Sequence, residues 1–202
     1  MENKDMIGIH VEGHIKIWDP STKEIFIDKR NAIHYENMSI ALANGLSNRG
    51  QQYVYQMAFG NGGTTVDPTG IITYLTPNTV GINAGLYNQT YAKIVNDSDQ
   101  SNYDPTRNYI EVLHTSGNNY TDVLVTCLLD YGEPVNQSAY DTLSNGENAY
   151  VFDELGLISY DPQGENKLLT HVVFHPVQKA LNRLIQVDYT VRIQTLTGLL
   201  GA

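Results

Sequence analysis

The sequence predicts a mainly β protein, an antiparallel β-sandwich or barrel with an N-terminal hairpin and one amphipathic helix. Three observations predict this fold class. Short runs of β-branched and aromatic residues recur along the chain, turn-forming residues separate them, and one stretch alone has helical spacing of its apolar residues. With 202 residues, 41% hydrophobic and 17% charged, the chain can bury one good core. We therefore expect one domain that covers residues 1–202.

The first element is expected to be a β-hairpin between Ile7 and Ile27. Apolar and polar residues alternate on both sides of the stretch DPSTKE, in which Asp19 and Pro20 favour a turn. The alternation predicts one buried face and places Trp18 on the opposite one. The residues expected on the buried face are Ile7, Ile9, Val11, Ile15, Ile17, Ile25 and Ile27.

The helix follows within residues 31–50. Its apolar residues follow helical spacing, Asn or Ser is available as the N-cap, and Gly50 is expected to stop it. The apolar residues are Ile33, Met38, Ala41, Leu42 and Leu46.

The remaining strands are expected after the helix. Strand-like runs occupy residues 53–59, 85–95, 108–115, 120–130, 149–160, 167–177 and 183–193. Residues of about 60–86 are rich in Thr, Pro, Asn and Gly without a clear period, which predicts a long loop or arm.

The end of the chain is the second candidate arm. If the last strand ends near Ile193, Leu196, Leu199 and Leu200 have no alternating pattern that places them in the sheet. Residues 194–202 are then either an arm that docks on a neighbouring copy or a tail that covers its own sheet.

The glycine-rich stretch MAFGNGGTTVDPTG, residues 57–70, is tested first as a phosphate site. No Lys follows the glycines, as a P-loop needs, and no helical period follows them, as a dinucleotide site needs. We therefore expect no cofactor here. Gly60, Gly62 and Gly63 are interpreted as a structural turn, with positive φ, that ends a strand and begins the arm.

Other stretches give no complete set of metal ligands. His10 and His14, like His171 and His175, are four residues apart on a strand and hence about 13 Å apart. The segment NDSDQSNYD, residues 96–104, lacks the central Gly and closing Glu of an EF-hand, which favours a solvated loop. We therefore expect no metal site.

Catalytic groups are also not indicated. Asp153 and Glu154 are adjacent and would face opposite sides of a strand, which does not make a glycosidase pair. Cys127 lies in an apolar run and is interpreted as a small buried residue. We expect the protein not to be an enzyme, while a hydrolase assembled from distant strands stays open.

Charge and termini indicate where the protein works. The net charge is −10 and the basic residues form no block, so neither nucleic acid nor a membrane is an expected partner. Charged residues stand where a signal peptide needs an apolar stretch, and no apolar run reaches membrane-spanning length. We expect the chain to be made in a reducing cytoplasm.

The order of short motifs resembles small structural proteins of tailed-bacteriophage virions, found in necks or collars, tails, baseplates and tail-fibre attachments. In such proteins a helix precedes a GxG turn, an E-x-G-L strand and a closing strand pair. The matching residues are Gly60, Gly62, Gly63 and Thr64, then Glu154, Gly156 and Leu157, then Phe174, Pro176, Val177 and Lys179, and finally Tyr189, Thr190 and Arg192. The resemblance implies a virion protein that binds other virion proteins and copies of itself as a homo-oligomer. The alternative is a carbohydrate- or receptor-binding β-sandwich in which Trp18 and the tyrosines stack on sugars.

Overall fold

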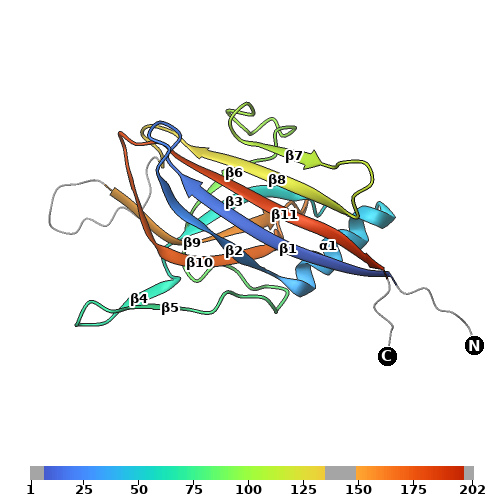
Figure 1. Ribbon diagram of the computed structural model, residues 1–202, viewed down its shortest axis with the longest axis horizontal. Helices are drawn as coiled ribbons and strands as arrows, with labels where there is room; N and C mark the ends of the chain where they lie inside the picture. Colours follow the sequence, from blue (N-terminus) through green and yellow to red (C-terminus); the bar gives the residue numbers. More distant parts are fainter. Residues whose placement is uncertain (1–6, 135–148, 198–202) are drawn as a thin grey trace, which may run out of the picture.

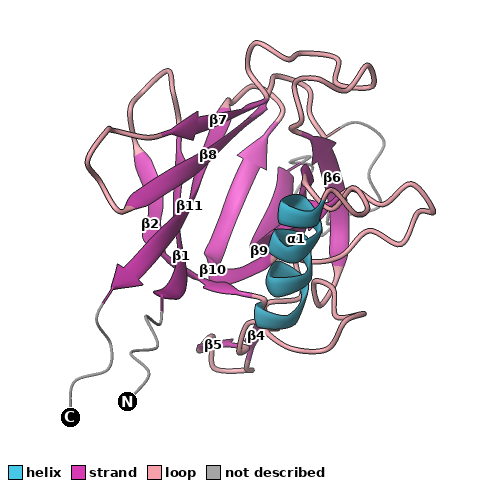
Figure 2. Ribbon diagram, turned by 90° about the vertical axis from the view of Figure 1, so that its right-hand side faces the viewer, coloured by secondary structure: helices cyan, strands magenta, loops and turns pink. Residues whose placement is uncertain are grey.

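The protein is described by a computed structural model, which covers residues 7–134 and 149–197. These residues form one long antiparallel sheet that curls into a half-barrel, with a helix lying in the mouth of the curl (Figure 1 and Figure 2). The mainly β, antiparallel fold predicted from the sequence is thereby confirmed.

The large sheet has nine strands in the order β6-β3-β9-β10-β2-β1-β11-β8-β7, and β4 and β5 form a separate two-stranded ribbon. Each neighbouring pair is antiparallel. The elements are β1 (Ile7–Trp18), β2 (Ile25–Ile33), α1 (Tyr35–Ser47), β3 (Val54–Gly60), β4 (Thr64–Val66), β5 (Ile72–Tyr74), β6 (Gln89–Ile94), β7 (Tyr109–Leu113), β8 (Tyr120–Leu129), β9 (Ala149–Ser159), β10 (Thr170–Ala180) and β11 (Ile185–Thr197).

The hairpin of β1 and β2 is confirmed, with two corrections to its buried face. Ile15 and Ile17 are fully buried, but Ile25 is exposed because a bulge between Ile17 and Trp18 places it on the outer side, opposite Trp18. Ile9 does lie on the inner face, yet it is exposed because it lines an open groove between β1 and α1.

The helix is shorter than the predicted segment, and its caps differ. His34 is the N-cap, and its Nδ1 accepts a hydrogen bond from the backbone N–H of Asn37 at 3.2 Å. At the other end Asn48 adopts the left-handed conformation and terminates the helix, two residues before Gly50. Imidazole nitrogen is an unusual capping acceptor, so the preference for Asn and Ser pointed to the wrong residue.

The core lies inside the curl. Large aromatic side chains pack edge to face there, with Phe152 against Phe59 at 5.4 Å and against Phe174 at 5.8 Å between ring centroids. These residues come from β3, β9 and β10, the strands that also carry the base of the arm described below. Among the described residues, no helix is long and apolar enough to cross a membrane.

Candidate functional site

The structure sets one segment apart from the barrel, which we call the arm and define as residues 61–88, between β3 and β6. The predicted irregular loop contains the short strands β4 and β5, which the sequence pattern missed. Figure 1 shows this ribbon standing away from the nine-stranded sheet. Its attachment to the barrel and its exposed surface are the two features that could carry function.

Glu154 on β9 holds both ends of the arm. The side chain is fully buried, and its Oε1 accepts hydrogen bonds from the backbone N–H groups of Gly62 at 3.1 Å and Asn88 at 2.7 Å. Its Oε2 accepts a third from the N–H of Tyr87 at 2.8 Å. Gly62 begins the arm and the other two residues end it, so one carboxylate fixes the width of the arm at its base.

His171 on β10 connects the same carboxylate to the middle of the arm. Its Nδ1 accepts a hydrogen bond from the backbone N–H of Asn78 at 2.8 Å, and its Nε2 lies 3.0 Å from Oε2 of Glu154. Because Nδ1 acts as an acceptor, the hydrogen-bond network assigns the ring proton to Nε2, which donates to Glu154. The imidazole is fully buried.

These contacts keep Glu154 charged. Burial raises the pKa of the Glu154 carboxyl, but the hydrogen bonds from His171 and from the three backbone N–H groups outweigh it, and the pKa lies below its ordinary value. The carboxyl is therefore ionised at neutral pH. The glycine-rich turn therefore does bind an anion, which is the Glu154 carboxylate of the same chain.

Asp153 provides a second attachment beside the first. Its Oδ1 accepts from the N–H of Gly63 and its Oδ2 from the N–H of Thr64, both at 2.9 Å, and the Thr64 hydroxyl also donates to Oδ2. The sequence analysis weighed Asp153 and Glu154 only as a catalytic pair. The signal that could have revealed their role is the pairing of two adjacent carboxylates with a glycine-rich stretch rich in free N–H groups.

The glycines of the turn are needed for space and not for positive φ, which corrects the sequence-based interpretation. Gly60, Gly62 and Gly63 are not among the residues with positive φ. A Cβ atom on Gly60 would lie 2.5 Å from Oε1 of Glu154, and one on Gly62 would lie 2.8 Å from the backbone N of Asn88. Only glycine lets the turn approach the carboxylate this closely.

The outer surface of the arm is nearly uncharged and exposes several apolar side chains among threonines and asparagines. Val66, Ile71 and Val80 are 62%, 64% and 68% exposed, and Tyr74 is half exposed. Asp67 is the one charged residue between positions 61 and 88, in a chain whose net charge is −10. This composition is typical of the centre of a protein interface, where charged residues are depleted.

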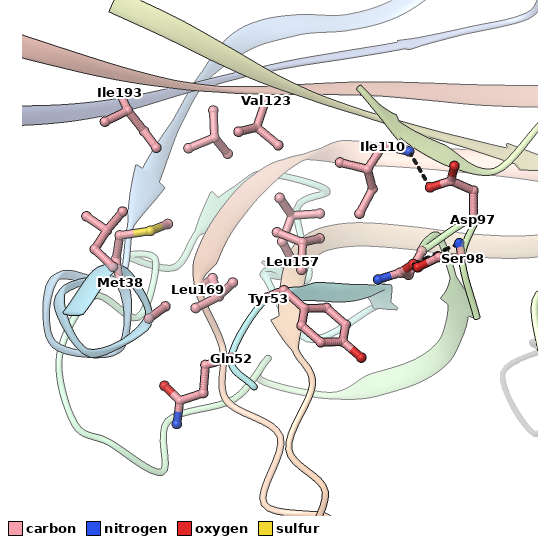
Figure 3. Close-up of a pocket in the computed structure, with 15 residues that line it drawn as sticks. Met38, Gln52, Tyr53, Asp97, Ser98, Ile110, Val123, Leu157, Leu169 and Ile193 are labelled. Atoms are coloured by element: carbon pink, nitrogen blue, oxygen red, sulfur yellow. Dashed lines mark hydrogen bonds between the residues drawn. The ribbon is translucent and has the colours of Figure 1, made fainter. Parts of the chain in front are cut away.

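A cavity of about 430 Å³ lies between α1 and the inner face of the sheet (Figure 3). The buried side chains of Met38, Leu157 and Leu169 line it together with the exposed side chains of Tyr53 and Asp97. Its size falls within the range of small-molecule sites, and its wall is mainly aliphatic. Because α1 fills the mouth of the curl only in part, this cavity follows directly from the packing of one short helix against a wide sheet.

A second, polar cavity lies between β6 and the loop that follows it, and its charged groups pair with one another. Lys93 contacts the carboxylate of Glu133, and Arg107 contacts Asp104 and Asp130. Nearby, the buried Lys179 donates to the carbonyl oxygen of Glu133 at 3.0 Å, and burial lowers its pKa to about 8.

The remaining predicted residues are spread over the barrel. His10 and His14 are exposed on the outer side of β1, His175 is exposed on β10, and within the described ranges no group of three potential ligands could hold a metal. Ser98 and Ser101 close Asx turns on Asn96 and Asp99, as expected of a solvated loop. Cys127 is buried as predicted, and burial raises its pKa to about 12.

The last strand is longer than the sequence suggested. β11 continues to Thr197, and Leu196 pairs with Gly8 of β1, so Leu196 belongs to the sheet and not to an arm. The two-residue period did not reveal this because Leu196 lies on the outer face of β11, where polar residues precede it. Leu199 and Leu200 lie outside the described residues.

Comparison of this chain with protein-family models, with curated proteins and with solved structures gave no significant match.

Proposed function

We propose that this protein is a structural subunit of a tailed-bacteriophage virion, in the neck or collar or in the tail or baseplate, where it mediates subunit assembly or fibre attachment. The observation that carries the proposal is the arm. An exposed ribbon with several apolar side chains and one charged residue is fixed to a barrel by two buried carboxylates, Asp153 and Glu154.

This arrangement suits assembly for a physical reason. A net charge of −10 makes contacts between copies repulsive over most of the surface. The arm removes that repulsion locally and offers apolar area whose burial is favourable by about 25 cal/mol per Å². Its fixed base lowers the entropic cost of ordering the contact surface when a neighbour binds.

The resemblance to virion proteins fits the same residues. Gly60, Gly62 and Thr64 of the matched turn, and Glu154 of the matched strand, meet at the base of the arm. The first part of the motif series that carries the resemblance therefore lies at the attachment of the arm. This placement supports the proposal.

The sugar-binding alternative placed stacking on Trp18 and the tyrosines, and the surroundings of the Trp18 ring do not favour its part. The Nζ atoms of Lys16 and Lys23 lie 4.9 and 5.0 Å from the ring centroid, and the indole N–H donates to Asp188 at 2.7 Å. The Trp18 ring thus already has cationic partners and a hydrogen-bonded N–H within its own chain.

The test is incorporation into particles. Antibody labelled with gold should mark the neck or the tail of purified virions in electron micrographs, and absence from purified particles would contradict the proposal. Particles grown with Val80→Lys as the sole copy should lack the protein or fail to assemble. Val112→Lys, equally exposed on β7, is the matched control and should be incorporated normally.

A further inference from the structure

The free edge of β5 carries the next inference. β4 faces the barrel, because the N–H of Thr64 donates to Asp153, whereas β5 pairs with β4 on one side only. The other edge of β5 pairs with no strand among the described residues, although the hydroxyl of Tyr74 lies 3.2 Å from Nδ1 of His175 on β10, and Thr73 and Tyr74 are exposed.

The register of the ribbon defines which backbone groups this edge presents. The N–H of Leu75 donates to the carbonyl of Gly63, and the N–H of Asp67 donates to that of Ile71. Hydrogen-bonded pairs alternate along an antiparallel ladder, so the Thr65–Thr73 pair between them is also hydrogen-bonded. The N–H and C=O groups of the two flanking residues, Ile72 and Tyr74, therefore point away from β4.

These four outward groups have no hydrogen-bond partner in the part of the chain that the structure describes. Exposed edges are normally protected by a charged residue, a Pro or a bulge. The two edge strands of the large sheet follow this rule, because β6 carries Lys93 and β7 carries Glu111. Residues 70–75, GIITYL, have no charge and no Pro and are rich in residues that favour strands.

We propose that β5 pairs antiparallel with β5 of a second copy, about a two-fold axis at Thr73, to form a four-stranded sheet. Ile72 then lies opposite Tyr74 of the other copy, and each such pair exchanges two hydrogen bonds, so all four outward groups of each strand are satisfied. The same pairing packs an aromatic ring against a β-branched side chain, a favourable cross-strand pair.

A second copy is the partner that this edge fits. Identical short strands are self-complementary under a two-fold axis, and the arm is a surface on which two chains of charge −10 meet almost without like charges. The inference goes beyond the proposed function, because it follows from the edge whether or not the chain is a virion protein.

Cysteine substitutions test the axis directly. Across the proposed axis the two Thr73 residues form a non-hydrogen-bonded pair with Cα atoms about 4.5 Å apart, within disulfide range. Thr73→Cys should therefore give a disulfide-linked dimer with oxidised glutathione. Thr65→Cys is the matched control, because the two β4 strands would lie about 14 Å apart and cannot be bridged. Cross-linking of both variants or of neither would overturn the proposal.

Charge substitutions test it without covalent trapping. In sedimentation equilibrium the wild-type protein should dimerise as concentration rises. Thr73→Lys and Thr73→Glu should each weaken dimerisation about ten-fold, because like charges then meet at the axis, and an equimolar mixture of the two should restore it. A wild-type protein that is monomeric at all concentrations would overturn the pairing, even if gold labelling still placed it in particles.

Discussion

At the base of the arm two buried carboxylates accept backbone hydrogen bonds, whereas at its tip, a few residues away, Val66 and Ile71 lie in solvent. The base and the tip of the arm therefore have different roles. Charged hydrogen bonds are directional and fix geometry, so the base sets where the ribbon points. Exposed apolar side chains contribute little to the isolated chain and gain free energy only when a neighbour covers them. Substitutions at the base should therefore change folding, and substitutions at the tip should change association.

Removing the carboxylate of the base should have the largest effect. Glu154→Ala leaves four donors without their acceptor, one of them the buried imidazole of His171, and we expect the free energy of unfolding to fall by about 3–5 kcal/mol in urea titrations. Glu36→Ala is the matched control. Glu36 accepts one hydrogen bond from the arm, at Gly81, in an exposed position, so its loss should cost less than about 1 kcal/mol. Equal effects of the two substitutions would contradict the central role of Glu154.

Filling the space beside the carboxylate should have the next largest effect. In Gly60→Ala the new methyl group would meet the Glu154 carboxylate and the carbonyl oxygen of Asn88, and we expect a loss of about 1–3 kcal/mol. Gly85→Ala, in the same arm, is the control because its Cβ would have no atom within 4 Å and its φ is not positive. Chemical denaturation of both variants measures the difference. A Gly60→Ala protein as stable as Gly85→Ala would show that the turn is looser than the structure describes.

These two residues also show how far sequence reasoning reached. Alternation and turn residues were sufficient to predict the barrel strands. A two-residue period arises when one face of a strand is buried, so it can be read from the sequence directly. The sequence-based interpretation gave the glycines positive φ, whereas they lie close to neighbouring atoms without it. Whether a glycine is needed for its φ or for a close approach depends on what lies beside it, here Glu154, about 90 residues away in the chain.

The other differences between the sequence-based prediction and the structure also depend on residues that are distant in the chain or on segments that are very short. The bulge shifts the pairing of β1 and β2 by one residue and so moves Ile25 to the outer face. Apolar periodicity alone does not predict such a shift. β4 and β5 are three residues each, too short for a period to appear. The link from Glu154 through His171 to Asn78 joins three separate segments, so no local pattern could predict it.

The difference in pH dependence between the wild-type protein and a Glu154 variant should report on the base of the arm. The folded-state pKa of Glu154 is depressed, so its contribution is complete above the ordinary carboxyl value of 4.5 and is lost as pH falls through the lower folded value. Below about pH 4.5 the wild-type protein should therefore lose stability more steeply than Glu154→Gln, in which this group does not titrate. The difference between the two unfolding curves removes the shared contribution of the other carboxylates. Parallel curves would show that Glu154 does not have a depressed pKa.

The tip should give the smallest effect on the isolated chain. Ile71→Ser removes an apolar side chain that is 64% exposed, and we expect the free energy of unfolding to change by less than about 0.5 kcal/mol. The N–H of Ile71 still donates to Asp67, and the backbone keeps this bond in the variant, so the turn between β4 and β5 is preserved. Thermal unfolding of dilute protein measures the effect on the monomer, where the proposed pairing is absent. A loss above about 1.5 kcal/mol would mean that Ile71 packs against its own chain, and the division between a folding base and an associating tip would then fail.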